Sequence, residues 1–91
     1  MKILFLEGDM SRSGGTERMT AWLANSLCET HSVTIASLSG GSKSFFELYP
    51  KVKNIFISNK HPRTAIQQLI KSGKIDVVIN VDTGMSIFGI P

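Results

Sequence analysis

The sequence predicts an α/β protein, a Rossmann-like three-layer domain with a parallel sheet of about four strands. Three observations lead to this fold. Short apolar runs recur along the 91 residues, stretches with helical spacing separate them, and two glycines precede the first helical stretch. Strands that alternate with helices are joined by right-handed crossovers, so the strands run parallel and helices cover both faces.

Four apolar runs are interpreted as strands: ILFL (3–6), VTIASL (33–38), NIFI (54–57) and DVVINV (76–81). The first, third and fourth are nearly continuous, as expected for parallel strands covered on both faces. In the common order 3-2-1-4, the first strand lies inside the sheet and the fourth at an edge. An apolar edge strand is prone to pair with another chain, so we expect an oligomer contact there unless something covers this edge.

The first helical stretch follows Gly14 and Gly15. One mostly apolar stripe recurs at i, i+3, i+4, i+7 and i+8, and consists of Met19, Trp22, Leu23, Ser26 and Leu27. Such a stripe indicates a helix face that is buried in a core rather than a ligand site. We therefore expect Trp22 to pack on the sheet.

The second helix has signals at both ends. Pro62 suits its first position, His61 the cap before it, and Gly73 a left-handed terminator. Its expected buried stripe consists of Ile66, Leu69 and Ile70.

Two further segments complete the chain. The polar loop SLSGGSKS (37–44) leads into FFELYP (45–50), which predicts a single helical turn stopped by Pro50. The last segment, TGMSIFGI (83–90), is apolar and has no obvious partner, which indicates part of a longer protein.

Composition excludes several classes. Hydrophobic residues make up 42% of the chain and charged residues 19%, as in ordinary globular proteins. One cysteine, Cys28, allows no internal disulfide, and one Cys with two distant His suggests no metal site. No apolar run approaches the about 20 residues of a membrane span or the roughly 7–15 of a signal peptide. We expect a soluble, cytoplasmic protein.

Positive charge is concentrated in the second half of the chain. Lys43 to Lys74 contains seven basic residues and one acid, a net charge of +6, whereas the remainder carries −3. One interpretation is a solvated face. The other is contact with a phosphorylated ligand or with anionic lipid, which would make the protein peripheral at the inner face of a membrane. Aromatic residues do not alternate with these lysines, so nucleic acid is not expected as a partner.

The glycine-rich loop predicts an anion site. Ligands of such sheets bind beyond the carboxyl ends of the strands, where the winding reverses, so the loops 8–15 and 82–86 should face one cleft. Gly14 and Gly15 let the backbone approach a ligand and lead into a helix whose first N–H groups lack partners. The helix dipole favours a phosphate or carboxylate there.

Other interpretations of this loop stay open. Neither the dinucleotide fingerprint nor the Walker A spacing is present, and the glycines could simply shape the loop. Glu17 would repel an anion unless its side chain turned away or met Arg12, Arg18 or a sugar hydroxyl.

The first 38 residues resemble the amino-terminal opening of GT-B-fold glycosyltransferases of family 4. Members begin with an apolar strand and a loop that ends in Gly-Gly-x-Glu-Arg, which corresponds here to Gly14, Gly15, Glu17 and Arg18. LANSL (23–27) and a His before VTIASL also match. KSGKIDVVINVD (71–82) is similar to the start of the family's fourth strand.

The resemblance implies the acceptor-side half of a two-domain enzyme. Residues 1–91 would be an incomplete amino-terminal domain, and the carboxyl-terminal donor-binding domain would be missing. Such enzymes transfer a sugar, often a hexose, from a nucleotide-sugar to a glycan or lipid-linked acceptor in polysaccharide synthesis. They usually retain the anomeric configuration and need no metal or other cofactor. By this likeness the donor-phosphate or acceptor-binding candidates are Gly14, Gly15, Thr16, Glu17 and Arg18, followed by Arg12, Ser13 and Thr83.

The sequence departs from the family in one loop. Many members place a His after the fourth strand, next to the reacting sugar, whereas this chain has Asp82 there. Asp82 is the catalytic candidate, although it could equally cap a turn onto Thr83. The 91 residues alone are expected to be inactive. Two alternatives remain: a non-catalytic α/β module that holds a phosphorylated ligand through SRSGG (11–15), and one subunit of a split glycosyltransferase.

Overall fold

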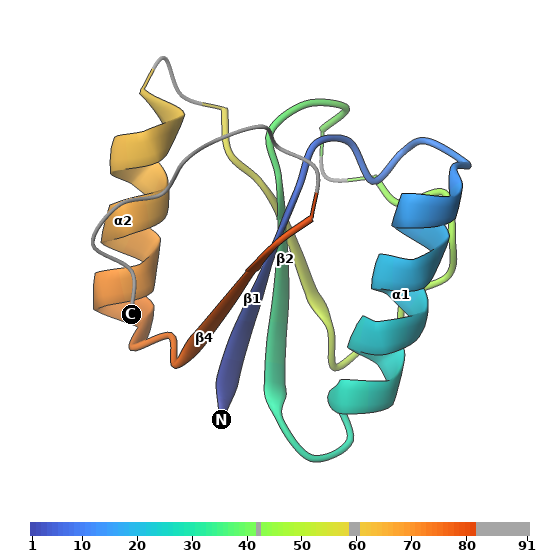
Figure 1. Ribbon diagram of the computed structural model, residues 1–91, viewed down its shortest axis with the longest axis horizontal. Coiled ribbons are helices and arrows are strands. Elements are labelled where there is room, and N and C mark those ends of the chain that lie inside the picture. Colours follow the sequence, from blue (N-terminus) through green and yellow to red (C-terminus); the bar gives the residue numbers. More distant parts are fainter. Residues whose placement is uncertain (42, 59–60, 82–91) are drawn as a thin grey trace.

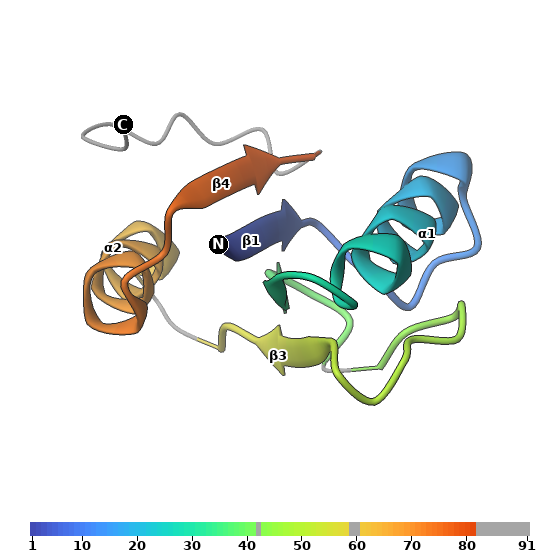
Figure 2. The same cartoon turned by 90° about the horizontal axis from the view of Figure 1, so that it is seen from below.

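The computed structural model describes residues 1–41, 43–58 and 61–81. Its elements in chain order are β1 (Lys2–Glu7), α1 (Gly15–Leu27), β2 (Ser32–Ser37), β3 (Lys53–Phe56), α2 (Pro62–Gly73) and β4 (Val77–Asn80). All strand pairs are parallel, and the sheet order is β3-β2-β1-β4. Helix α1 covers one face and α2 the other (Figures 1 and 2). The predicted fold class and strand order are confirmed.

Strand β1 lies in the middle of the sheet, and its alternation builds one core on each face. Ile3 and Phe5 belong to the core under α1, whereas Leu4 and Leu6 belong to the core under α2. The paired strands continue this pattern, because Phe5 pairs with Ile35 of β2 on one side and with Ile79 of β4 on the other. Burial of both faces explains why the run from Ile3 to Leu6 has no polar residue.

The packing face of α1 differs from the predicted one. Trp22 is 63% exposed and Met19 56%, whereas Leu23 and Leu27 are partly buried. The residues that α1 buries are instead Glu17, Thr20, Ala21 and Ala24. Small side chains allow a helix to approach the sheet closely, so the alanine side faces the core and Trp22 turns outward. The expectation that Trp22 packs on the sheet is wrong.

Helix α2 follows its prediction at the start and along its face. Pro62 is the first helical residue, and Ile66 is fully buried, with Leu69 and Ile70 partly buried beside it. His61 occupies the cap position without a side-chain capping bond.

The end of α2 corrects the prediction for Gly73. The left-handed residue is Lys74, with φ 52°, and Gly73 is the last residue of the helix. The Ile75 N–H donates to the Ile70 carbonyl at 3.0 Å, the bond that closes a Schellman motif around a left-handed residue. This bond places the positive φ one residue after the glycine.

The predicted helical turn at residues 45–49 is also wrong. This segment is irregular and runs along α1, and a turn follows at 50–51. The Asn25 side chain explains the difference, because its Nδ2 donates to the Glu47 carbonyl at 2.9 Å and its Oδ1 accepts from the Tyr49 N–H at 2.8 Å. Phe46 and Leu48 pack against the core below α1. Backbone groups that bond to Asn25 in this way cannot also close a helical turn.

Candidate functional site

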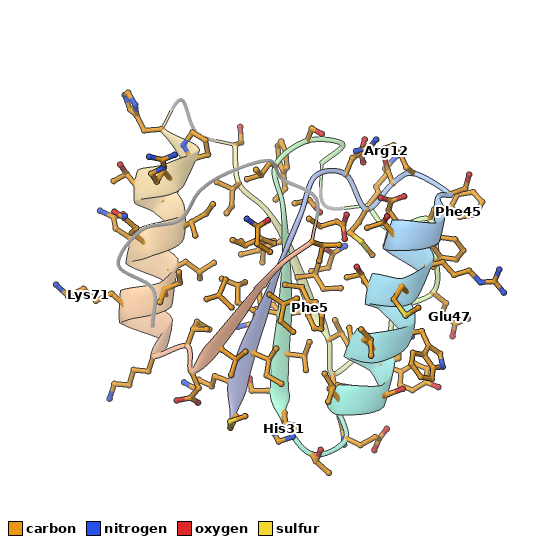
Figure 3. All side chains as sticks on the ribbon, in the orientation of Figure 1. Phe5, Arg12, His31, Phe45, Glu47 and Lys71 are labelled. Atoms are coloured by element: carbon orange, nitrogen blue, oxygen red, sulfur yellow. The ribbon has the colours of Figure 1, made fainter. Side chains whose placement is uncertain are left out.

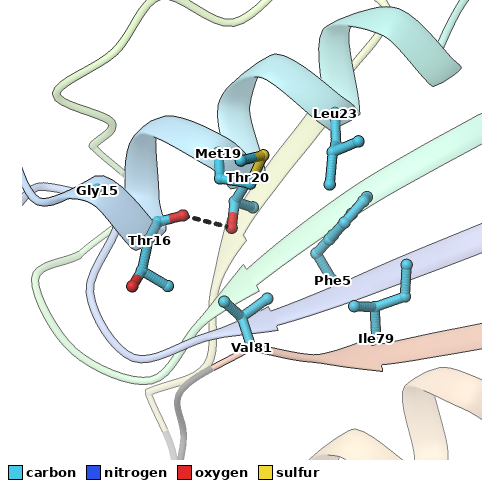
Figure 4. A pocket seen from close by; sticks show the side chains of 8 residues that line it. All are labelled: Phe5, Gly15, Thr16, Met19, Thr20, Leu23, Ile79 and Val81. Carbon is cyan, nitrogen blue, oxygen red and sulfur yellow. Dashed lines mark hydrogen bonds between the residues drawn. The ribbon is translucent and has the colours of Figure 1, made fainter.

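A cavity of about 370 Å³ lies between the first half of α1 and the sheet, next to the edge strand β4 (Figure 4). Its lining residues are Phe5, Gly15, Thr16, Met19, Thr20, Leu23, Ile79 and Val81. Gly15 and Thr16 begin α1, and Val81 follows the last residue of β4. The glycine loop and the carboxyl end of β4 therefore meet at one cavity, at the edge of the sheet where doubly wound folds bind ligands.

The cavity is apolar along its length and polar at one end. Five of its side chains are apolar, and the hydroxyl groups come from Thr16 and Thr20 (Figure 4). The Thr20 hydroxyl donates to Glu7 Oε2 at 2.8 Å and also lies 2.9 Å from the Thr16 carbonyl oxygen. An anionic group could be held only at this polar end, where α1 starts.

The first turn of α1 is closed partly by its own side chain. Glu17 is 4% exposed, and its Oε1 accepts a bond of 3.0 Å from the Gly14 N–H. A Cβ on Gly14 would lie 2.5 Å from that oxygen. Glycine at position 14 is thus explained by the cap. The Glu17 carboxylate is turned back onto the Gly14 N–H, and Glu17 is not among the residues that line the cavity.

At position 15, by contrast, no contact within the described structure explains why the residue is glycine. It is the first residue of α1, and no atom lies within 4 Å of the position that a Cβ would take. The described part of the chain has no side-chain cap at this helix end other than Glu17 on Gly14. The surface at Gly15 is open backbone at the mouth of the cavity.

The loop before α1 is held by its own hydrogen bonds. Asp9 Oδ1 accepts from the Ser11 N–H at 2.9 Å and from the Ser11 hydroxyl, and Asp9 Oδ2 lies 4.0 Å from Arg12 Nε. The bond from the Ser11 hydroxyl is the main reason that the pKa of Asp9 lies below its ordinary value, and the Ser11 N–H and Arg12 act in the same direction. The loop is therefore a fixed turn.

A second loop fastens this turn to the sheet. The Gly8 carbonyl accepts from the Ser39 N–H at 2.8 Å and from the Ser39 hydroxyl at 3.0 Å. Met10 is fully buried in the core under α1, and its carbonyl accepts from the Phe45 N–H at 2.8 Å. Gly40, with φ +80°, lies so close to Asp9 that a Cβ there would overlap the carboxylate. These contacts set where α1 begins.

Buried polar residues that the sequence analysis did not select lie beneath this helix end. Glu7 and Ser37 are register partners at the ends of β1 and β2, and both are fully buried. Thr20 bonds to Glu7 from above. The signal was present in the sequence, since Glu7 is a charged residue that directly continues an apolar strand. Its position suits a structural link between β1 and α1.

The other predicted site residues are distributed as follows. Arg18 is exposed and lines a second hollow of about 350 Å³ with Gly15, Met19 and Trp22. Arg12 and Ser13 are exposed in the loop before α1. Asp82 and Thr83 lie outside the described residues. Roles in binding for all of these remain predictions.

The basic residues of the second half are spread over several elements. Lys43, Lys51, Lys53, Arg63, Lys71 and Lys74 are all exposed, and Lys51 pairs with Glu29 at 3.8 Å. Figure 3 shows Lys71 on the outer side of α2. Lys60 lies outside the described residues. Within the described ranges, no three His, Cys, Asp or Glu side chains gather as metal ligands. Neither described helix has the length and apolar character needed to cross a membrane.

Together, the parallel sheet and the cavity at its carboxyl edge define a Rossmann-like domain with a ligand-sized cavity. In an alignment 98 positions long, the chain is 32% identical to a protein of Haemophilus influenzae named as an uncharacterized glycosyltransferase. The alignment covers 96% of this chain and 27% of that relative, so the chain spans about a quarter of the relative's length. No family model matches the chain.

Proposed function

We propose that the chain is the acceptor-side part of a retaining glycosyltransferase of the GT-B type. The whole protein would transfer a sugar from a nucleotide-sugar to a glycan or lipid-linked acceptor. Support comes from the relative named as a glycosyltransferase and from the Rossmann-like fold. The 91 residues alone are proposed to catalyse no transfer, because the donor-reading residues of such enzymes belong to the other half.

The observation that carries this proposal is the position of Gly15. Gly15 stands at the first turn of α1, at the mouth of the cavity, and the described structure has room for a side chain there. The fold itself therefore does not require glycine at this position. A diphosphate could approach this backbone closely, and the N–H groups of Gly15 and Thr16 would donate to it. Charge develops on the diphosphate as the sugar leaves, so fixed N–H donors and the helix dipole would stabilise the transition state.

Inorganic pyrophosphate tests this site without knowledge of the nucleotide. Titration of the isotope-labelled chain should move the amide resonances of Gly15 and Thr16, with smaller changes at Thr20. Gly15→Ala should weaken binding by about tenfold, because a methyl group would stand between the anion and the N–H groups. Gly73→Ala is the matched control, since this helical glycine also has room for a Cβ, whose nearest neighbour would be 3.6 Å away.

Two results would contradict the proposal. Pyrophosphate could shift only the amides near Lys53 and Lys71, which would indicate ordinary attraction to basic residues. Alternatively, the whole protein could bind pyrophosphate through Gly15 and yet transfer no sugar from any nucleotide-sugar, which would leave the non-catalytic binding module.

A further inference from the structure

The start of α1 depends on polar contacts for its position on the sheet. The residues that the helix buries are Glu17, Thr20, Ala21 and Ala24. Glu17 bonds back to the Gly14 N–H and so joins the helix to its own loop. The two alanines pack in the core beyond the first turn, and apolar contacts have no preferred direction. Packing alone would therefore let the first turn shift or rotate on the sheet.

A buried hydrogen bond ties this part of α1 to the strand beneath it. The Thr20 hydroxyl donates to Glu7 Oε2 at 2.8 Å, and Glu7 is the last residue of β1. Both side chains are buried, Thr20 with 2% exposure and Glu7 with none. A hydrogen bond is directional, and away from water it is stronger than at the surface. This bond therefore sets the orientation of the helix on β1, which apolar packing does not.

The same hydroxyl also reaches the first turn. Thr20 Oγ1 lies 2.9 Å from the Thr16 carbonyl oxygen (Figure 4). Thr16 supplies one of the two N–H groups that are proposed to hold a diphosphate. Thr20 lines the cavity, whereas Glu7 does not. Thr20 thus connects the end of β1 with the backbone of the proposed anion site, and Glu7 acts through Thr20.

Given the proposed function, on which this inference rests, we infer that Thr20 and Glu7 are positioning residues for the anion site. They hold the first turn of α1 where its N–H groups reach the mouth of the cavity. The donors of a binding site must stay within roughly 0.5 Å of their productive positions, and a supporting hydrogen bond can achieve this. Loss of the bond should therefore weaken anion binding even in the fraction of the protein that remains folded.

Substitutions at Thr20 test the bond from the side of the helix, with inorganic pyrophosphate as the probe and NMR titration of the labelled chain as the measurement. Thr20→Val keeps the shape of the side chain and should weaken binding by about tenfold. Thr20→Ser restores the hydroxyl and should restore the affinity. Ser37→Ala is the matched control, because Ser37 is the fully buried register partner of Glu7 and its hydroxyl has no hydrogen-bond partner among the described residues. It should bind like the unchanged chain.

A pair of substitutions at Glu7 tests the bond from the side of the strand. Glu7→Gln and Glu7→Leu remove the same charge, but only the glutamine keeps an acceptor oxygen for Thr20. Any effect of charge on anion binding is therefore common to both variants. The glutamine variant should bind pyrophosphate about tenfold more tightly than the leucine variant. This pair also keeps the inference testable if Thr20→Val fails to fold, which circular dichroism would show.

A measurement without ligand tests the positioning directly. Residual dipolar couplings report the direction of each N–H group relative to the sheet. The couplings of Gly15 and Thr16 should change in Thr20→Val and stay the same in Ser37→Ala. A purely structural role would instead lower the free energy of unfolding and leave these couplings, and the affinity of the folded chain, unchanged.

Two results would overturn the inference and leave the proposed function standing. Folded Thr20→Val could bind pyrophosphate as tightly as the unchanged chain, or the two Glu7 variants could bind equally. The opposite result is also distinguishable. If pyrophosphate does not shift the amides of Gly15 and Thr16 in the unchanged chain, while Thr20→Val still alters their dipolar couplings, the proposed anion site is refuted and the positioning of the first turn is supported.

Discussion

The Glu17 carboxylate accepts a hydrogen bond from the Gly14 N–H, 3.0 Å away, and so caps the start of α1 from within the helix. This bond satisfies one donor, whereas the N–H groups of Gly15 and Thr16 belong to the first turn, where an α-helix offers no partner. The cap therefore leaves further N–H groups at this helix end without a helical partner. The two adjacent glycines have different reasons to be glycine, and this difference can be measured.

Alanine at positions 14 and 15 should change stability in opposite directions. Gly14→Ala places a Cβ against Glu17 and displaces the cap, which should lower the free energy of unfolding by about 1 kcal/mol. Gly15→Ala meets open space and restricts the unfolded chain, so it should raise that free energy by about 0.4–1 kcal/mol. Urea denaturation measures both values. Equal destabilisation by both substitutions would show that the fold also requires glycine at position 15.

Position 40 should tolerate alanine much less than position 41. Both glycines have positive φ, +80° and +72°, so alanine costs roughly 1–2 kcal/mol at either. At Gly40 the new Cβ would also overlap the Asp9 carboxylate, whereas at Gly41 no atom lies within 4 Å. Thermal unfolding should thus show a clearly lower Tm for Gly40→Ala than for Gly41→Ala. Similar values would mean that the Asp9 loop moves away without cost.

Removal of the Thr20 hydroxyl should destabilise the junction of β1 and α1. Thr20→Val keeps the shape of the side chain but takes a hydrogen bond from the fully buried carboxylate of Glu7, which should cost about 1–3 kcal/mol. Thr16→Val makes the same chemical change at an exposed position one turn earlier and serves as the control. If both variants unfold at the same urea concentration, the Thr20–Glu7 bond contributes nothing measurable.

The hydrogen bonds around Asp9 predict a pH dependence. Because the pKa of Asp9 is lower in the folded protein than in the unfolded chain, the contribution of Asp9 to stability is complete above the unfolded value. It is lost as the pH falls through the lowered pKa. Carboxyl NMR should show this low titration midpoint, and Ser11→Ala should raise the pKa toward its ordinary value. An unchanged midpoint in that variant would exclude the Ser11 hydroxyl as the main cause.

The strand order and the packing of α2 could be predicted from the sequence because their signals agree. Continuous apolar runs, right-handed crossovers and Pro62 all specify the same arrangement. The face of α1 could not, because two apolar stripes compete on one helix. Size decided between them: Ala21 and Ala24 let the helix approach the sheet, and Trp22 is too large for that contact.

At the site, the sequence indicated where the glycines lie but not what they contact. Glycine at positions 14 and 15 predicts an open helix start, whereas the cap by Glu17 depends on one side-chain rotamer. Gly40 lies close to the Asp9 side chain, although the two residues are 31 positions apart along the chain. No local sequence pattern predicts such a contact. Met10 was missed because a single apolar residue within a polar loop has no periodicity.

The outward stripe of α1 should make these 91 residues prone to associate in concentrated solution. The fold itself does not need Met19 or Trp22 to be apolar, since the alanines beside them make the contact with the sheet. Polar replacements there would improve resistance to precipitation without loss of architecture. We therefore expect the chain to stay in solution at higher concentrations whenever the stripe is covered.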